Sequence, residues 1–244
     1  METNALIYSG IAGAATFSGI LAVLWRQKLA LKYSHYVNSF AAGSLLTLAL
    51  AKLIPEASGL TSSTTLVVLA SFIAFFLLEA VVVSHSGLEI HFQEGPRRAA
   101  LAKGPVIFSG LFLHSLVDGF VIAVGFAVSF EFGLLAAGAV ILHELPEGIT
   151  TFALLLIRMA RKTALILSVA VALATPVGAA LAMGPLGSLS ESGLGVMLAI
   201  GAGSFLYVAA SDLIPETHQG DIPRNVVAVL LGAVLMYLTV ILLD

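Results

Sequence analysis

The stretch Ile141–Thr150, ILHELPEGIT, places a histidine and two glutamates within five residues of otherwise apolar sequence. A charged carboxylate in an apolar environment is costly unless something compensates its charge. In a helix, residues four apart lie on one face, so His143 and Glu147 share a face. The cluster therefore predicts a partner that carries positive charge.

A second cluster repeats this pattern. HSLVDG (114–119) matches HELPEG (143–148) in its histidine, leucine and glycine, with an acid at the fifth position, so His114 and Asp118 also share a helical face. Two antiparallel helices with these faces would bring two imidazoles and two carboxylates together. That donor set suits a divalent transition-metal ion such as zinc or iron. The alternative is a protein-only network in which protonated histidines pair with the acids. The two matching pairs favour the metal site.

The composition decides which kind of protein can hold such a site. Of 244 residues, 59% are hydrophobic and 10% are charged, whereas soluble domains carry about 25% charged residues. The mean hydropathy is +1.06. We therefore predict an all-α integral membrane protein whose partners are the bilayer and metal ions, with no nucleic acid and no prosthetic group. There are no cysteines, which excludes disulfides and thiolate ligands, and the N-terminus lacks the features of a cleaved signal peptide.

Segments of about 20 apolar residues are needed to cross a bilayer. The apolar stretches and the polar breaks between them predict eight spans. They are 3–25, 35–56, 65–84, 104–128, 132–157, 163–184, 191–213 and 223–243.

The basic residues predict the orientation. Ten of the eleven Lys and Arg residues follow spans 1, 3, 5 and 7, which places both termini on the non-cytoplasmic side. The absence of cysteine and of a targeting peptide favours a plasma (inner) membrane. The ten residues are Arg26, Lys28, Lys32, Arg97, Arg98, Lys103, Arg158, Arg161, Lys162 and Arg224.

The chain also contains an internal repeat. AAGSLLTLALAKLIPEA (41–57) and GAGSFLYVAASDLIPET (201–217) are identical at nine of 17 positions at a constant offset of 160. The predicted orientation runs the two copies in opposite directions, as in the inverted repeats of transporters. A Pro-Glu helix end used twice for packing is the alternative. We predict one domain over 1–244 in a 3+2+3 arrangement: a first repeat (1–85), a central helix pair (104–157) and a second repeat (163–244).

Span number, repeat and motifs together resemble the ZIP (Zrt/Irt-like) family of divalent metal transporters, over the whole chain. The resemblance implies uptake of zinc, or of iron, manganese or cadmium, toward the cytoplasm by a homodimer. It also implies an elevator-like motion of spans 1, 4, 5 and 6 against the other four.

The resemblance also assigns site residues. His114, Asp118, His143 and Glu147 match the positions of the primary metal site, and Glu144 matches one that in some members helps to bind a second metal.

Two positions depart from the family pattern. Ser115 stands where members often have asparagine, and span 6 lacks the acid that some members carry there. We therefore expect one firm metal site and a second that is weak or absent.

Acidic and histidine side chains near the ends of the repeat copies complete the candidate ligands. Glu56 lies at the outer end of span 2, and Asp212, Glu216 and His218 lie at the inner end of span 7. They are interpreted as entrance and exit ligands for the metal. Solvated interfacial charge is the alternative. Lys52 occupies the repeat position of Asp212, and the sequence leaves its partner open.

Rival functions use the same residues. HELPE resembles the His-Glu-x-x-His motif of zinc proteases, and Ser115, His114 and Asp118 could serve a lipid hydrolase. An enzyme has no need of an inverted repeat, so we expect a transporter and no enzyme. A metal-gated channel or a proton-coupled exchanger would need the same ligands and stays open at this stage.

Overall fold

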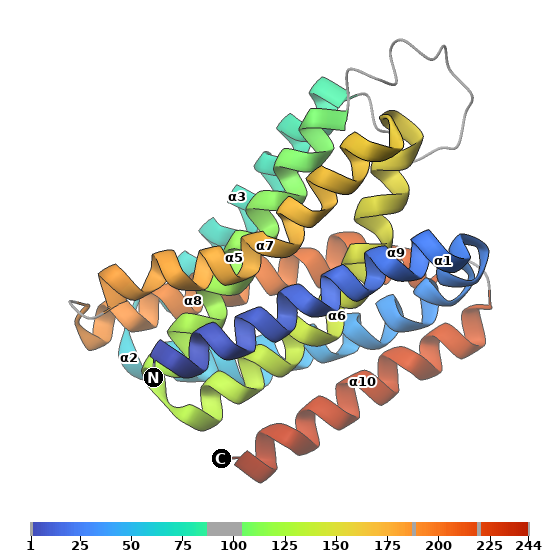
Figure 1. The fold of residues 1–244 in the computed structure, drawn as a ribbon. Helices are drawn as coiled ribbons and strands as arrows, with labels where there is room; N and C mark the ends of the chain where they lie inside the picture. Colours follow the sequence, from blue (N-terminus) through green and yellow to red (C-terminus); the bar gives the residue numbers. More distant parts are fainter. Residues whose placement is uncertain (1, 87–103, 187–188, 219–220, 244) are drawn as a thin grey trace.

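All elements in the part of the chain that the computed structural model describes are helices (Figure 1). The described residues are 2–86, 104–186, 189–218 and 221–243, so Arg97, Arg98 and Lys103 of the predicted orientation lie outside them. The elements are α1 (Glu2–Leu48), η1 (Ala49–Leu53), α2 (Ile54–Leu60), α3 (Thr64–Ser86), α5 (Gly104–Val128), α6 (Phe130–Arg158), α7 (Arg161–Leu186), α8 (Glu191–Tyr207), η2 (Val208–Leu213), α9 (Ile214–Thr217) and α10 (Ile222–Leu243).

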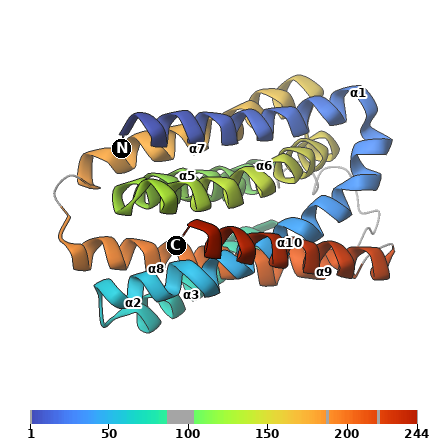
Figure 2. The same cartoon turned by 90° about the horizontal axis from the view of Figure 1, so that it is seen from below.

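Helix α1 is bent into two arms. Arg26 has non-helical backbone angles, φ −143° and ψ 62°, and separates a first arm (2–25) from a second arm (27–48). The second arm turns back at the bend and runs away from the first (Figure 1), with α6 between the two arms in Figure 2. A break between two spans was predicted here, and the backbone is non-helical at Arg26. Helical structure resumes directly after it, because RQKLALK contains good helix formers and no glycine or proline.

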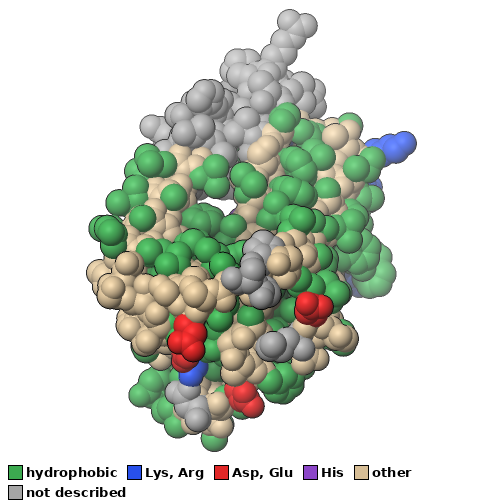
Figure 3. Space-filling model, turned by 90° about the vertical axis from the view of Figure 1, so that its left-hand side faces the viewer, with side chains coloured by type: hydrophobic (Ala, Val, Ile, Leu, Met, Phe, Trp, Pro, Cys, Tyr) green, Lys and Arg blue, Asp and Glu red, His purple; other side chains and the backbone are tan. Residues whose placement is uncertain are grey.

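Among the described residues, six helical segments are long and apolar enough to cross a membrane. One of them, Glu2–Leu60, contains the first two predicted spans, and the third predicted span corresponds to the shorter apolar segment Thr64–Leu78. The structure thus confirms an all-helical membrane protein, and the number of eight spans stays a prediction. Hydrophobic side chains are spread over the face seen in Figure 3, with few charged side chains among them, as expected where lipid replaces water.

The two copies of the sequence repeat share an unusual local structure. Each contains a π-helix, η1 or η2, directly before its Ile-Pro-Glu segment. The amide of Ile54 donates to the carbonyl of Ala49, and the amide of Ile214 donates to that of Ala209. Proline has no amide hydrogen and cannot continue an α-helical ladder, so the turn before it widens in both copies. The repeat is therefore present in the backbone as well as in the sequence.

Reciprocal glycine contacts bring pairs of helices to backbone distance. A Cβ atom added at Gly178 would lie 2.8 Å from the carbonyl carbon of Leu116, and one at Gly119 would lie 2.7 Å from the amide nitrogen of Ala179. Small residues allow this close approach in membranes, where dispersion contacts replace the hydrophobic effect. Three such pairs occur among the described helices: Gly19 with Gly148 (α1–α6), Gly119 with Gly178 (α5–α7) and Gly43 with Gly232 (α1–α10).

The α5–α7 contact gives a prediction about stability. Replacing Gly178 with Ala should lower the stability of the detergent-solubilised protein by about 1–3 kcal/mol, because the new methyl group meets the backbone of Leu116. Gly184 lies on the same helix with open space around it, so Gly184→Ala is the matched control and should be neutral or slightly stabilising. Thermal unfolding midpoints measure the difference, and equal midpoints would contradict the close contact.

Candidate metal centre

The centre is built on the helical hairpin of α5 and α6. Ser129 is the only residue between them, and its hydroxyl accepts a hydrogen bond from the amide of Phe132 at 3.0 Å, which caps the start of α6. So short a link makes the two helices antiparallel neighbours. The predicted motifs lie near the middle of each helix, where they face each other.

Four of the predicted side chains converge. His114, Asp118, His143 and Glu147 each offer one ligand atom, and these atoms all lie within 4.8 Å of one another. Asp118 is fully buried and His143 is 3% exposed. The i, i+4 spacing in both motifs thus produces the predicted group of two imidazoles and two carboxylates.

Asp118 occupies the middle of this group. Its Oδ2 atom lies 3.0 Å from Nε2 of His143 and 3.2 Å from Nε2 of His114. The second carboxylate closes the group, with Oε2 of Glu147 at 3.7 Å from Nε2 of His114. One carboxylate oxygen is therefore shared between the two rings.

The backbone fixes the tautomer of His143. Its Nδ1 atom lies 3.0 Å from the carbonyl oxygen of Ala139, which can only accept, so Nδ1 must donate. In a neutral ring Nε2 is then an acceptor that faces the Asp118 oxygen, another acceptor. That contact is favourable only with a proton or a metal cation between the two atoms. A histidine whose other nitrogen is held by a carbonyl is also the usual arrangement of a metal ligand.

The other nitrogen and oxygen atoms of the group are also suited to binding a cation. Among the described residues, Nδ1 of His114 and Oδ1 of Asp118 are buried without a hydrogen-bond partner, and buried polar atoms are seldom left so. The Ser115 hydroxyl donates to Oε1 of Glu147 at 2.9 Å and orients that carboxylate. Ser115 is therefore placed to support a ligand.

Glu144 lies outside this group. It is fully buried, and its two carboxylate oxygens accept hydrogen bonds from different helices: one from Thr16 of α1, and one from Thr175 of α7 at 2.6 Å. The carboxylate thus joins α6 to both neighbours. The second metal site, which was expected to be weak or absent, would use Glu144. In this structure both oxygens of that carboxylate accept hydrogen bonds from threonine hydroxyls.

The candidate entrance and exit residues are dispersed. Glu56 lies on α2, 3.8 Å from Nζ of Lys52, which gives Lys52 the partner that the sequence left open. His218 is exposed after α9. Asp212 lies in η2 and Glu216 in α9, but their side chains lie outside the described part of the structure.

The sequence analysis missed Thr16 and Thr175. Each is a single hydroxyl in an apolar helix, a pattern that also occurs where threonine bonds only to its own backbone. Pairing either one with Glu144 requires knowing that α1 and α7 pack against the same side of α6. No local pattern carries that information.

The hydroxyl pair around Glu144 gives a second prediction. Thr175→Val keeps the shape and removes the donor to Glu144, so it should cost about 1–3 kcal/mol of stability, the penalty for a buried acceptor left unpaired. Thr151 is equally buried, and its hydroxyl has no partner within the described structure. Thr151→Val is therefore the control and should be neutral or stabilising. Thermal unfolding in detergent compares the two variants, and a larger loss for Thr151→Val would show that the Glu144 contacts are not stabilising.

Comparison with known proteins is consistent with this geometry. No curated protein matches the chain. A family model described as ZIP Zinc transporter matches residues 84–239, well over half of the chain and the whole of the α5–α6 hairpin. The protein is thus a membrane protein of a metal-transporter family, and it belongs to the ZIP zinc transporter family.

Proposed function

We propose that the protein carries divalent transition-metal cations, zinc above all, across the bilayer toward the cytoplasm. The observation that carries this proposal is the convergence of His114, Asp118, His143 and Glu147 within 4.8 Å in the interior of a helical membrane protein. Membership in a family of zinc transporters agrees with it. Ser115, Glu144 and the more distant acids are assigned supporting parts below.

The chemistry of the donors explains the choice of ion. Imidazole nitrogens and carboxylate oxygens without thiolates suit zinc, and also iron, manganese or cadmium. Two carboxylates compensate a doubly charged ion, so its transfer from water into the protein interior is not prohibitive. Ligands on one rigid hairpin hold the ion without a large rearrangement of the site.

We further propose eight spans in a 3+2+3 arrangement. The two arms of α1 are counted as one span each, and the repeat pairs the second arm of α1, η1 and α2 with α8, η2 and α9. The matching π-helices support this inverted repeat. Both termini then face away from the cytoplasm, and a homodimer in the inner membrane is the form that the family resemblance implies.

We group the spans into two bodies, and the backbone contacts at glycine support this grouping. The first body contains the first arm of α1 with α5, α6 and α7, and it is held by the pairs Gly19–Gly148 and Gly119–Gly178. Thr16 and Thr175 add their hydrogen bonds to Glu144 within the same body. The second body contains the second arm of α1 with α3, α8 and α10, where Gly43 meets the backbone of α10 and Gly203 meets that of α3.

Side-chain contacts of a looser kind join the two bodies. Phe205 of α8 packs edge-on against the His143 ring, with the ring centroids 6.1 Å apart. Val121 of α5 lies against Gly201 of α8, and Nζ of Lys52 lies 5.6 Å from the ring centroid of Phe132. Such contacts can be exchanged as one body slides past the other. We infer an elevator-like motion in which the first body carries the metal.

The outer residues fit this path as ligands that pass the ion along. We assign Glu56 to the entrance and Asp212, Glu216 and His218 to the exit. At the entrance the ion would compete with Lys52 for Glu56, so the ammonium group keeps the carboxylate compensated between transport cycles.

The proposed function is tested by metal uptake into proteoliposomes loaded with a zinc- and cadmium-responsive dye. Wild-type protein should give saturable flux, and the double variant His143→Ala, Glu147→Ala should fall to the level of protein-free vesicles because it loses half of the ligands. Metal binding to the wild-type protein without flux would refute a carrier and favour an intramembrane enzyme or a sensor. Flux that does not saturate would favour a channel.

Glu147 is a proposed metal ligand and Ser115 only orients it, and this difference gives a separate prediction. Glu147→Ala removes a proposed ligand and should abolish saturable uptake. Ser115→Ala removes the hydrogen bond that orients Glu147, and should weaken apparent metal affinity only about tenfold, the low end for loss of a supporting contact. Ser168→Ala is the control, because Ser168 is buried and without a hydrogen-bond partner among the described residues. Equal losses for Ser115→Ala and Glu147→Ala would make Ser115 a ligand and contradict a single firm site.

A further inference from the structure

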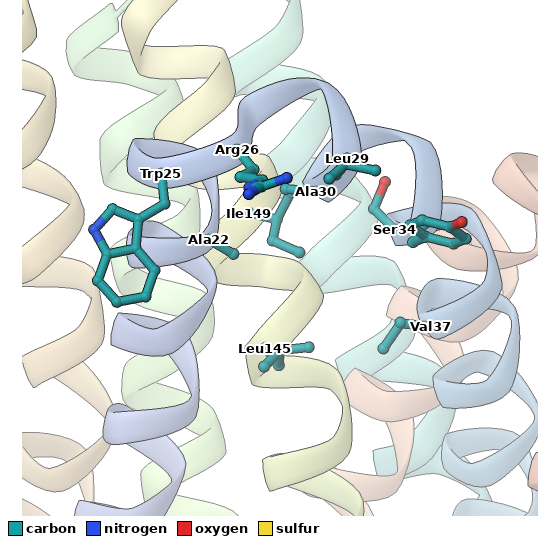
Figure 4. A pocket seen from close by; sticks show the side chains of 10 residues that line it. Ala22, Trp25, Arg26, Leu29, Ala30, Ser34, Val37, Leu145 and Ile149 are labelled. Atoms are coloured by element: carbon teal, nitrogen blue, oxygen red, sulfur yellow. The ribbon is translucent and has the colours of Figure 1, made fainter.

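An open groove lies at the bend of α1, beside the face of α6 that carries Leu145 and Ile149. Its volume is about 440 Å³, within the range of about 300–1,000 Å³ that is usual for ligand sites. Ala22 of the first arm, Val37 of the second arm, and Leu145 and Ile149 of α6 form apolar walls, and Arg26 lies at the bend (Figure 4). We call this site the elbow groove.

The elbow groove combines apolar walls with a free positive charge. Figure 4 shows the Arg26 side chain between the two arms, close to Ile149. Within the described part of the chain, no carboxylate lies at ion-pair distance from Arg26. The hydroxyl of Ser34, which also lines the groove, already donates to the carbonyl of Leu31 at 2.9 Å. The aromatic residues Trp25 and Tyr33 add one neutral polar group each. A ligand of this groove would therefore need one anionic group and an apolar chain.

The surroundings match the headgroup region of a bilayer. Lys28 and Lys32 are exposed close to the bend, on the side assigned above to the cytoplasm. Trp25 is 84% exposed and Tyr33 is 52% exposed at the groove, and such aromatic residues are enriched at membrane interfaces. Anionic lipids of the cytoplasmic leaflet attract basic clusters of this kind.

We propose that the elbow groove binds an anionic phospholipid, with its phosphate on the Arg26 guanidinium and one acyl chain between the arms against Leu145 and Ile149. Guanidinium groups bind phosphate through paired charge-assisted hydrogen bonds. The apolar walls can bury an acyl chain, whereas a soluble phosphate ion has no apolar part to bury against them.

Because of the groove's position, the bound lipid should regulate metal transport, an inference that rests on the proposed function. One wall belongs to the first body and the other to the second arm of α1, so a sliding motion must change the shape of the groove. A lipid that fits one shape better shifts the equilibrium toward it. Metal flux should therefore depend on the anionic lipid content of the membrane.

The test measures lipid retention by native mass spectrometry of the purified protein after exchange into mixed phosphatidylglycerol and phosphatidylcholine. Wild type should retain phosphatidylglycerol selectively. Arg26→Gln should reduce that retention about fivefold, the effect of losing one basic contact at a membrane surface. Arg161→Gln is the matched control, because Arg161 is an exposed arginine at the start of α7, outside the groove. Ala22→Phe, which fills the groove, should lower retention as well.

Each other outcome has a defined meaning. Equal losses for Arg26→Gln and Arg161→Gln, or equal retention of the two lipids by wild type, would overturn the proposal, because binding would then reflect overall charge or any acyl chain. Uptake into vesicles with and without phosphatidylglycerol completes the test, with a response expected in wild type and absent in Arg26→Gln. Selective retention without metal flux in any vesicle would refute the transport function and still support the lipid site.

Discussion

The constraint on which the rest of the structure depends is the burial of two carboxylates, those of Asp118 and Glu144, inside a membrane-spanning bundle. The protein answers it in two ways. Glu144 is satisfied internally, since hydroxyls from two neighbouring helices donate to its oxygens. Asp118 instead faces two imidazole nitrogens through a single oxygen, an arrangement that is complete only with a proton or a metal ion. The Glu144 carboxylate therefore joins neighbouring helices, whereas the Asp118 carboxylate is suited to bind a metal ion.

Two kinds of packing contact occur between the helices, backbone contacts at glycine and contacts between larger side chains. Helices that carry the centre meet through glycine at backbone distance, and such contacts cannot slide without steric clash. Contacts across the two bodies use side chains such as Phe205 against His143. The small residues thus hold the centre and its neighbouring helices together as one packed unit.

The repeat shows how one local structure acquires two roles. Both copies widen into a π-helix before Pro55 and Pro215, because proline lacks the same donor in each. Their surroundings differ, with Lys52 in one copy at the position of Asp212 in the other. Lys52 pairs with Glu56, whereas the other copy carries the two acids Asp212 and Glu216. The two copies are therefore similar in backbone and different in net charge.

The sequence by itself determined the helical class, the membrane setting, the repeat and the four converging side chains, because hydropathy, proline and i, i+4 spacing act locally. It also placed the break at Arg26, where the backbone is non-helical, and it assigned Glu144 to a metal without its threonine partners. The tertiary structure alone decided those partners, the elbow groove and the close backbone contacts at glycine. These depend on which helices approach within backbone distance, and that is set by contacts between residues far apart in the chain.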